Sequence, residues 1–225
     1  MIGKYIHRNS ISILRTNSAT LTRSVHTYPE DLQIKAIKPS HFYAEQGDLL
    51  NWFYHVDHQG RIFAEETVPK NIATSIKAPK FLDFFFRQIQ YNSALGKFAD
   101  FAEYPWYSPC GKEHNFIKAA VTPVVFQDLD IESETLIWGA TLTAPFDPSS
   151  LRIDAEGMLY HPLKTKRGFD THCLIKSSLG VQLSERMEVE DVIGEGDDAK
   201  EDDTHTPVGT FQWNDTTYNI HSLYR

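Results

Sequence analysis

The chain has 225 residues, of which 41% are hydrophobic and 12% aromatic, and this content is enough to pack one large domain. No stretch reaches the roughly 18 consecutive apolar residues that a membrane-spanning helix needs. The formal net charge of −8 comes entirely from residues 188–203, which contain nine acidic residues and one basic residue, Lys200. The charges of the rest of the chain sum to zero, so we expect no basic surface that could bind nucleic acid.

The first 29 residues contain no Asp or Glu. On a helical projection three basic residues fall within about 40° of one another: Lys4, Arg8 and Arg15. Three isoleucines lie roughly opposite them: Ile2, Ile6 and Ile13. An acid-free amphipathic segment rich in Arg, Ser and Thr is typical of an organelle transit peptide, and a disordered basic tail is the alternative.

We therefore expect residues 1–24 to be a mitochondrial transit peptide, removed after Arg23 or Ser24. Loss of its four basic residues would take the net charge from −8 to −12. The mature protein is expected to be soluble and to reside in the mitochondrial matrix. Residues 25–51, interrupted by Pro29 and Pro39, are expected to form an irregular or short helical lead-in.

The ordered unit is expected to begin at Trp52. Residues 52–57 alternate in the period of a strand, Asp57 to Gly60 has the composition of a tight turn, and residues 61–64 return as a second strand. Two helices are predicted next, beginning at Pro69 and at Pro79. The second has a wide apolar stripe formed by Phe81, Leu82, Phe85, Phe86 and Ile89. On its other face, Asp83 and Arg87 are expected to form an exposed pair.

Short strands are predicted to dominate the remainder. Residues 97–107 are expected to be extended, and residues 108–111 to turn. Strands follow at 114–119, 124–126, 135–139, 141–146 and 158–161. Residues 173–189 are consistent with a strand followed by a helix capped by Ser177 or Ser178. A hairpin that turns at Asn214-Asp215 closes the chain.

These elements predict the α+β class: antiparallel hairpins and small sheets with a few packed helices, in one globular unit over residues 52–225. The acidic segment 190–206 cannot bury apolar surface and is expected to be a disordered loop. Its charges are expected to be solvated, with transient binding to a basic partner as the alternative.

Several short motifs occur in a fixed order: YHVDHQG at 54–60, SPCG at 108–111, NF at 115–116, PVVF at 123–126 and LYHP at 159–162. With this set the chain resembles uncharacterised protein family 0598 of the UPF series, whose members are eukaryotic and often targeted to mitochondria. The layout is also similar to a bacterial domain-of-unknown-function family. That second likeness implies two α/β half-units in tandem, about 52–126 and 127–225, and a binding or signalling role. Neither resemblance implies a defined reaction.

Cys110 is the most reactive side chain that the sequence suggests. Lys112 and His114 are close to it in sequence, and a nearby cation and turn amides would favour the nucleophilic thiolate. A lone cysteine is more often a small packed residue. With Cys173 as the only other cysteine, no disulfide framework is expected, and both thiols should be free.

A second candidate cluster contains His55, Asp57 and His58, and adding His161 or Cys110 would complete a plausible zinc set. Asp57 is equally well explained as a turn-former, and on a strand His58 would point away from the other two. His161 beside Tyr160 could act as an acid–base group, although a hydrogen-bonded structural histidine is the simpler interpretation. No metal or cofactor is therefore assigned.

The sequence contains no Ser-His-Asp arrangement, phosphate-binding glycine loop or dinucleotide fingerprint. We interpret the chain as a non-catalytic module that binds an unknown protein or small molecule, with no nucleic acid and no membrane span. His55, Asp57 and Lys112 are the candidate ligand-binding residues. The alternative is a small enzyme that uses Cys110 with His114, or a metal site centred on histidine.

Overall fold

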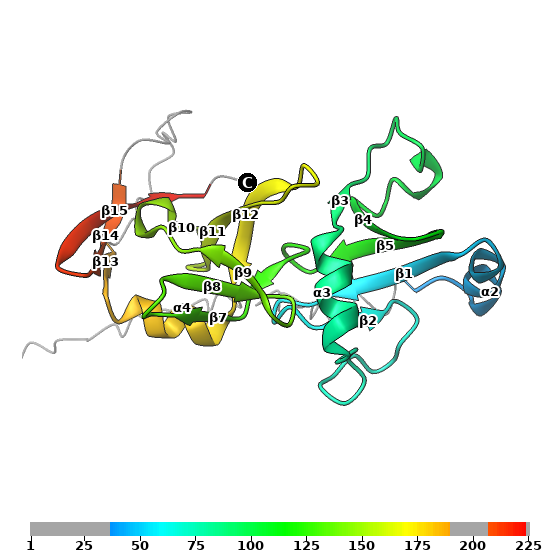
Figure 1. Cartoon of the computed structure of the whole chain (residues 1–225), viewed down its shortest axis with the longest axis horizontal. Helices are drawn as coiled ribbons and strands as arrows, with labels where there is room; N and C mark the ends of the chain where they lie inside the picture. The colour runs from blue at the N-terminus through cyan, green and yellow to red at the C-terminus, as the bar shows by residue number, and fades with distance from the viewer. Residues whose placement is uncertain (1–36, 190–206, 224–225) are drawn as a thin grey trace, which may run out of the picture.

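The computed structural model describes residues 37–189 and 207–223. The predicted leader, the first part of the lead-in and the acidic segment 190–206 lie outside the described residues. The fold is α+β, as predicted, and the described part contains three α-helices and three β-sheets. Figure 1 shows an elongated arrangement with a five-stranded sheet towards one end and a seven-stranded sheet towards the other. No helix in the described ranges is long and apolar enough to cross a bilayer.

The first sheet has the order β2-β1-β5-β4-β3. Its strands are β1 (Asn51–Val56), β2 (Ile62–Ala64), β3 (Gln90–Tyr91), β4 (Trp106–Cys110) and β5 (Glu113–Ala119). The predicted hairpin of β1 and β2 is confirmed, and its turn is held by Asp57, whose carboxylate accepts the backbone N–H groups of Gln59 and Arg61, both at 2.9 Å. The sequence did not predict that β1 pairs with β5 in parallel.

Helices cover both faces of this sheet. Residues paired across strands share a face, so Tyr54 and Ile117 lie on the face covered by α3 (Pro79–Arg87), where the rings of Tyr54 and Phe85 are 5.2 Å apart. On the opposite face Phe53 and Phe116 stack at 5.4 Å, next to α2 (Ser40–Asp48) and a 3₁₀ turn at Ala99–Phe101. The sheet is therefore a layer between two aromatic clusters.

The second sheet has the order β13-β14-β15-β10-β11-β12-β6. Its strands are β6 (Val125–Phe126), β10 (Arg152–Ile153), β11 (Leu159–Lys164), β12 (Asp170–Ile175), β13 (Met187–Val189), β14 (Pro207–Trp213) and β15 (Thr216–Ser222). The predicted final hairpin is confirmed, with Asn214 and Asp215 both at positive φ in its turn. The strand-then-helix interpretation of 173–189 is also confirmed, because β12 is followed by α4 (Ser177–Ser184).

A three-stranded antiparallel sheet contains β7 (Asp128–Asp130), β8 (Thr135–Trp138) and β9 (Leu142–Pro145), and a 3₁₀ turn follows at Pro148–Ser150. One hydrophobic cluster includes Val56 of the first sheet, Leu136 of the third and Phe211 of the second, so the three sheets share a core. β6, assigned by sequence to the first half-unit, pairs with β12 of the second sheet. The tandem half-units stay a prediction.

Five local predictions are wrong. No helix begins at Pro69, because the Asn71 side chain accepts the N–H groups of Ala73 and Thr74 and holds a turn instead. Residues 97–107 were expected to be extended, but they contain a 3₁₀ turn. The turn predicted at 108–111 is also misplaced, because residues 108–110 belong to β4 and the chain reverses at residues 111–112. No side chain caps the N-terminus of α4.

The fifth concerns α3. Asp83 does not form the predicted pair with Arg87; it accepts backbone N–H groups of Ala140 at 2.9 Å and Thr141 at 2.8 Å and the Thr141 hydroxyl at 2.6 Å. These bonds fasten α3 to the turn between β8 and β9. The exposed side of α3 therefore joins two parts of the molecule.

Candidate functional site

The structure does not bring Cys110 and His114 together. Cys110 pairs with Glu113 across the β4–β5 hairpin, and His114 is the next residue along β5, so the two side chains lie on opposite faces of the sheet. Partial burial, followed by the nearby Glu113, raises the pKa of the Cys110 thiol, which opposes the thiolate form. Lys112 is exposed at the hairpin turn. This geometry gives Cys110 neither a base nor a cation.

His114 has its own surroundings on the other face. Its ring lies 4.7 Å from that of Phe98, and Nδ1 is 3.3 Å from the side-chain oxygen of Asn51. Burial, and then the charge of Lys97, lowers the pKa of His114, so the imidazole is held neutral. It is a packed residue beside an aromatic cluster.

The histidines proposed as metal ligands are also separated. His55 is on β1, whereas His161 lies on β11 in the second sheet. His161 Nε2 accepts the backbone N–H of Asp147 at 3.0 Å, and Nδ1 lies 2.9 Å from the carbonyl oxygen of Pro162, so a neutral ring with its proton on Nδ1 satisfies both contacts. In the part of the chain that the structure describes, no three His, Cys, Asp or Glu residues form a group that could hold a metal ion.

A buried polar cluster that the sequence did not reveal lies on the α2 face of the first sheet. Glu65, only 4% exposed, accepts hydrogen bonds from the hydroxyl of Tyr104 at 2.6 Å and from that of Tyr43 at 3.0 Å. The ammonium of Lys118 is 3.1 Å from its other oxygen and 4.1 Å above the Tyr104 ring. One buried carboxylate thus ties α2, through Tyr43, to the sheet.

His55 lies on the same face, and the imidazole is 8% exposed. Its Nε2 atom is buried and has no hydrogen-bond partner among the described residues. Burial, and then the charge of Lys70, lowers the pKa of His55 to about 4, so the ring is neutral at physiological pH. His55 is therefore part of the buried framework and does not reach the surface as a ligand-binding group.

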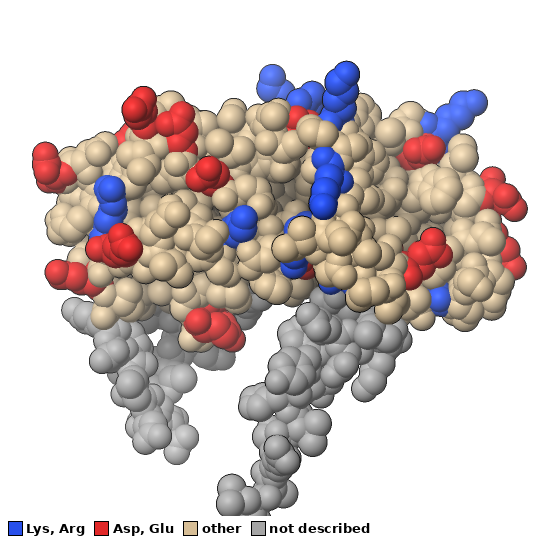
Figure 2. Space-filling view, turned by 90° about the horizontal axis from the view of Figure 1, so that it is seen from below, with Lys and Arg blue, Asp and Glu red and all other residues tan. Residues whose placement is uncertain are grey.

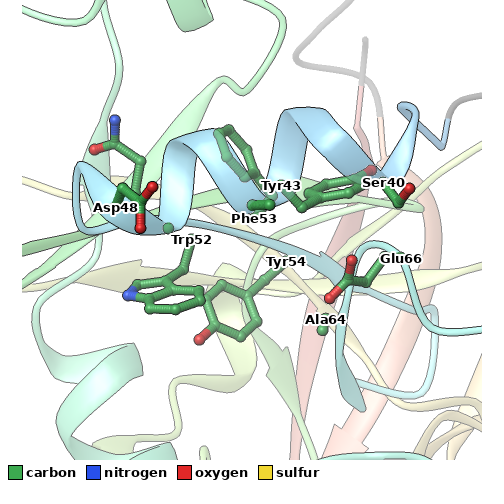
Figure 3. A pocket seen from close by; sticks show the side chains of 11 residues that line it. Ser40, Tyr43, Asp48, Trp52, Phe53, Tyr54, Ala64 and Glu66 are labelled. Atoms are coloured by element: carbon green, nitrogen blue, oxygen red, sulfur yellow. The ribbon is translucent and has the colours of Figure 1, made fainter.

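A candidate site is a groove of about 580 Å³ between α2 and the edge of β1, which we call the edge groove. It exists because β2 is short: β2 pairs with residues 54–56 of β1, Glu65 bonds the carbonyl of Phe53, and Asn51 and Trp52 have no strand neighbour on that side. Figure 3 shows the rings of Trp52 and Tyr54 next to each other, with Asp48 near one end of the groove and Glu66 near the other.

The edge groove is aromatic and acidic. Four aromatic residues line it (Tyr43, Trp52, Phe53 and Tyr54), and the described lining residues include Asp48 and Glu66 but no Lys or Arg. Trp52 is 41% exposed, an unusual exposure for the largest apolar side chain. Burial, followed by the charge of Glu113, raises the pKa of Tyr54 to about 12, so its phenol stays neutral. Aromatic faces beside carboxylates attract cations.

The chain is similar to a solved structure and to a protein family. It is similar to a solved structure of a DUF1285 family protein from Silicibacter pomeroyi DSS-3, with 14% identity, coverage of 84% of this chain and 92% of that one, and a TM-score of 0.43. The family described as domain of unknown function DUF4505 matches residues 44–224. Since this match spans most of the chain and nearly all of the described fold, the protein belongs to the DUF4505 family.

Proposed function

We propose that this protein is a non-catalytic binding module whose edge groove receives a positively charged group. The group is an ammonium or guanidinium, carried either by a small molecule or by a basic side chain of a partner protein. The exposed ring of Trp52, in a groove that Asp48 and Glu66 also line, is the observation that carries the proposal.

The chemistry of the lining favours a cation over an anion or a neutral ligand. A cation over an aromatic ring gains about 0.5–2 kcal/mol, depending on how far it is desolvated, and each carboxylate adds up to about 1 kcal/mol at an exposed site. An anion would face Asp48 and Glu66 without any lining cation. Because Glu65 holds Tyr43 and α2 in place, the groove is formed before a ligand binds.

Tryptophan fluorescence can test this proposal. The chain has four tryptophans, and Trp52 is the most exposed, whereas Trp138 and Trp213 are 6% and 2% exposed. Choline and its neutral isostere 3,3-dimethylbutan-1-ol have the same shape but differ in charge. We expect saturable quenching by choline and little by the alcohol. Lysine- and arginine-containing tripeptides, compared with their norleucine counterparts, test whether the cation is carried by a protein.

Three variants locate the effect. Trp52→Phe should remove the fluorescence change, and Glu66→Gln and Asp48→Asn should each weaken choline binding several-fold at low salt. Lys112→Gln, at the exposed β4–β5 turn and outside the groove lining, is the matched control and should bind as the parent does. Equal quenching by choline and the alcohol, or quenching that survives in Trp52→Phe, would refute the cationic site.

We also propose, from the basic leader and the ordered motifs, that the protein is a member of UPF family 0598 that works in the mitochondrial matrix. A copy tagged at its C-terminus should reach a protease-protected compartment and lose about 24 residues, as peptide mapping of its N-terminus would show. A variant with Lys4, Arg8 and Arg15 changed to Gln is the matched control and should stay outside. A tagged parent protein that remains in the cytosol with Met1 intact contradicts this location.

A further inference from the structure

The edge groove is larger than a single cationic group needs. Its volume of about 580 Å³ is in the range of sites that hold drug-sized ligands. Residues 51–54 of β1 all line it, which is a length of about 10 Å along the strand. Figure 3 shows Asp48 and Glu66 near opposite ends, so one ammonium cannot lie against both. These dimensions favour a ligand with two cationic groups.

Apolar surface continues beside the groove. Leu49 and Leu50, between α2 and β1, are 65% and 37% exposed, and Trp52 is 41% exposed. Neither leucine packs against the hydrophobic clusters in the described part of the chain. Single exposed apolar side chains need no explanation, but gathered ones mark interaction sites. Because the leucines do not line the groove, a small cation held in it would leave them in water.

The backbone of Leu50 makes its side chain harder to explain by folding alone. Its φ of 59° lies in the left-handed region, where glycine and asparagine fit and a bulky residue is strained. The reversal from α2 into β1 requires this φ but does not require leucine. Such strain gathers at functional sites. A contact outside the fold would explain why an apolar side chain is kept at this position.

The start of β1 also has an open backbone edge. Successive residues of a strand direct their backbone groups to opposite sides. The carbonyl of Phe53 accepts the N–H of Glu65, and the N–H of Asp57 donates to Arg61, so odd-numbered residues of β1 face β2. Asn51 therefore directs its N–H and C=O to the same side, beyond the end of β2. An extended chain can pair with an edge of this kind.

The charges around the edge groove favour a basic chain. Asp48 and Glu66 line it without an ion-pair partner in the described ranges. Three lysines of the neighbouring polar network are engaged in ion pairs or with backbone carbonyl oxygens (Lys38, Lys70 and Lys118). Lys112 lies at the turn into β5, which borders β1 on the side away from the open edge. Figure 2 shows more red carboxylates than blue cations over the right end of the molecule, where Figure 1 places α2.

We propose that the edge groove and the leucines beside it bind an extended segment of a partner protein. Two basic side chains of the segment lie against Asp48 and Glu66, an apolar side chain covers Leu49 and Leu50, and the backbone pairs with Asn51 beyond the end of β2. This inference rests on the proposed cationic site and names the class of ligand that the site takes.

A set of short peptides tests the need for two cations. Each probe is blocked at both ends, carries a dye, and has a leucine at each end inside which two lysines are separated by one, two or three threonines. Its partner has norleucine in place of one lysine. Fluorescence anisotropy with the full-length protein at low salt measures the affinity. The best spacing should bind at least threefold tighter than its norleucine partner, and Glu66→Gln should remove most of this difference.

Leu50→Asn separates the leucine contact from both the fold and the cationic site. It should weaken peptide binding at least threefold and leave the quenching by choline as in the parent protein. The melting temperature should not fall, because asparagine adopts positive φ more easily than leucine does. Leu49→Asn is a second replacement with the same expected split. Leu95→Asn, at a 97% exposed position between β3 and β4, is the matched control and should change neither measurement.

The outcomes distinguish this inference from the proposed function. Equal binding of the two-lysine peptides and their norleucine partners, or unchanged peptide affinity in both leucine variants, would overturn the extended segment while choline quenching still supported the cationic site. Equal quenching by choline and its neutral isostere would refute the cationic site and this inference with it. Self-association of the parent protein that Leu50→Asn abolishes in sedimentation velocity would assign the leucines to a second copy of the chain, and it would also overturn the inference.

Discussion

Replacing His55 by Phe should make the stability of the protein less sensitive to acid. His55 is 8% exposed, and burial, with the charge of Lys70 next, lowers its pKa from 6.5 to about 4. The folded protein therefore holds His55 neutral while the unfolded chain takes up a proton, so the stabilisation is complete above pH 6.5 and is lost as the pH falls towards 4. A difference of about 2.5 pKa units corresponds to about 3 kcal/mol, most of it lost by pH 4.5.

Urea unfolding at a series of pH values between 7.5 and 4.5 measures this effect. Between pH 7.5 and pH 4.5 the parent protein should lose about 2.5 kcal/mol more of its unfolding free energy than His55→Phe loses. At pH 7.5 the variant should be as stable as the parent or more so, because it removes a buried Nε2 that has no described partner.

His161 and His114, whose pKa values are also lowered, remain in both proteins and cancel in the comparison. His55→Leu provides a second replacement if Phe does not fit. Parallel pH profiles of the parent and both variants would show that His55 titrates at its ordinary pKa and that the reasoning from burial is wrong.

Two further sets of substitutions and one labelling measurement test other contacts. Lys118→Met should lower the free energy of unfolding in urea by about 3 kcal/mol, because it leaves the buried carboxylate of Glu65 without its ammonium partner. Adding Glu65→Gln should restore part of this loss. If it restores none, an unpaired buried charge is not the cause. Asp83→Ala should lower the free energy of unfolding by about 1–2 kcal/mol, because α3 loses its hydrogen bonds to Thr141. An unchanged melting temperature in thermal unfolding would show that these hydrogen bonds do not stabilise the fold. Iodoacetamide should label Cys110 more slowly than a free thiol at pH 8, because burial and Glu113 raise its pKa; faster labelling would contradict the structure.

The sequence predicted those elements that depend only on residues close together in the chain. The stripe that ends at Phe85, Phe86 and Ile89 defines α3, and Asn214-Asp215 defines the final turn because both residues tolerate positive φ. Strand pairing over long distances was not predictable in the same way. Alternation shows which side chains of β1 share a face, but it does not identify β5 as the parallel neighbour.

The candidate site depends even more on this register. Cys110 and His114 are four residues apart, yet the hairpin pairs Cys110 with Glu113 and so directs the histidine to the other face. The burial of Glu65 could have been predicted from the sequence. Glu65 lies two residues after the buried Phe63, so strand alternation places its carboxylate on the same buried face. The edge groove left none, since it results from where β2 ends and how α2 packs beside β1.

The position of β15 has a consequence for synthesis and for truncated forms of the protein. The last strand of the described residues is the third of seven in its sheet, between β14 and β10. A ribosome must therefore release the polypeptide through Ser222 before β10 can acquire this neighbour. A premature stop ahead of Thr216 would remove an interior strand and not a dispensable tail, and we would expect such a product to be degraded before it accumulates.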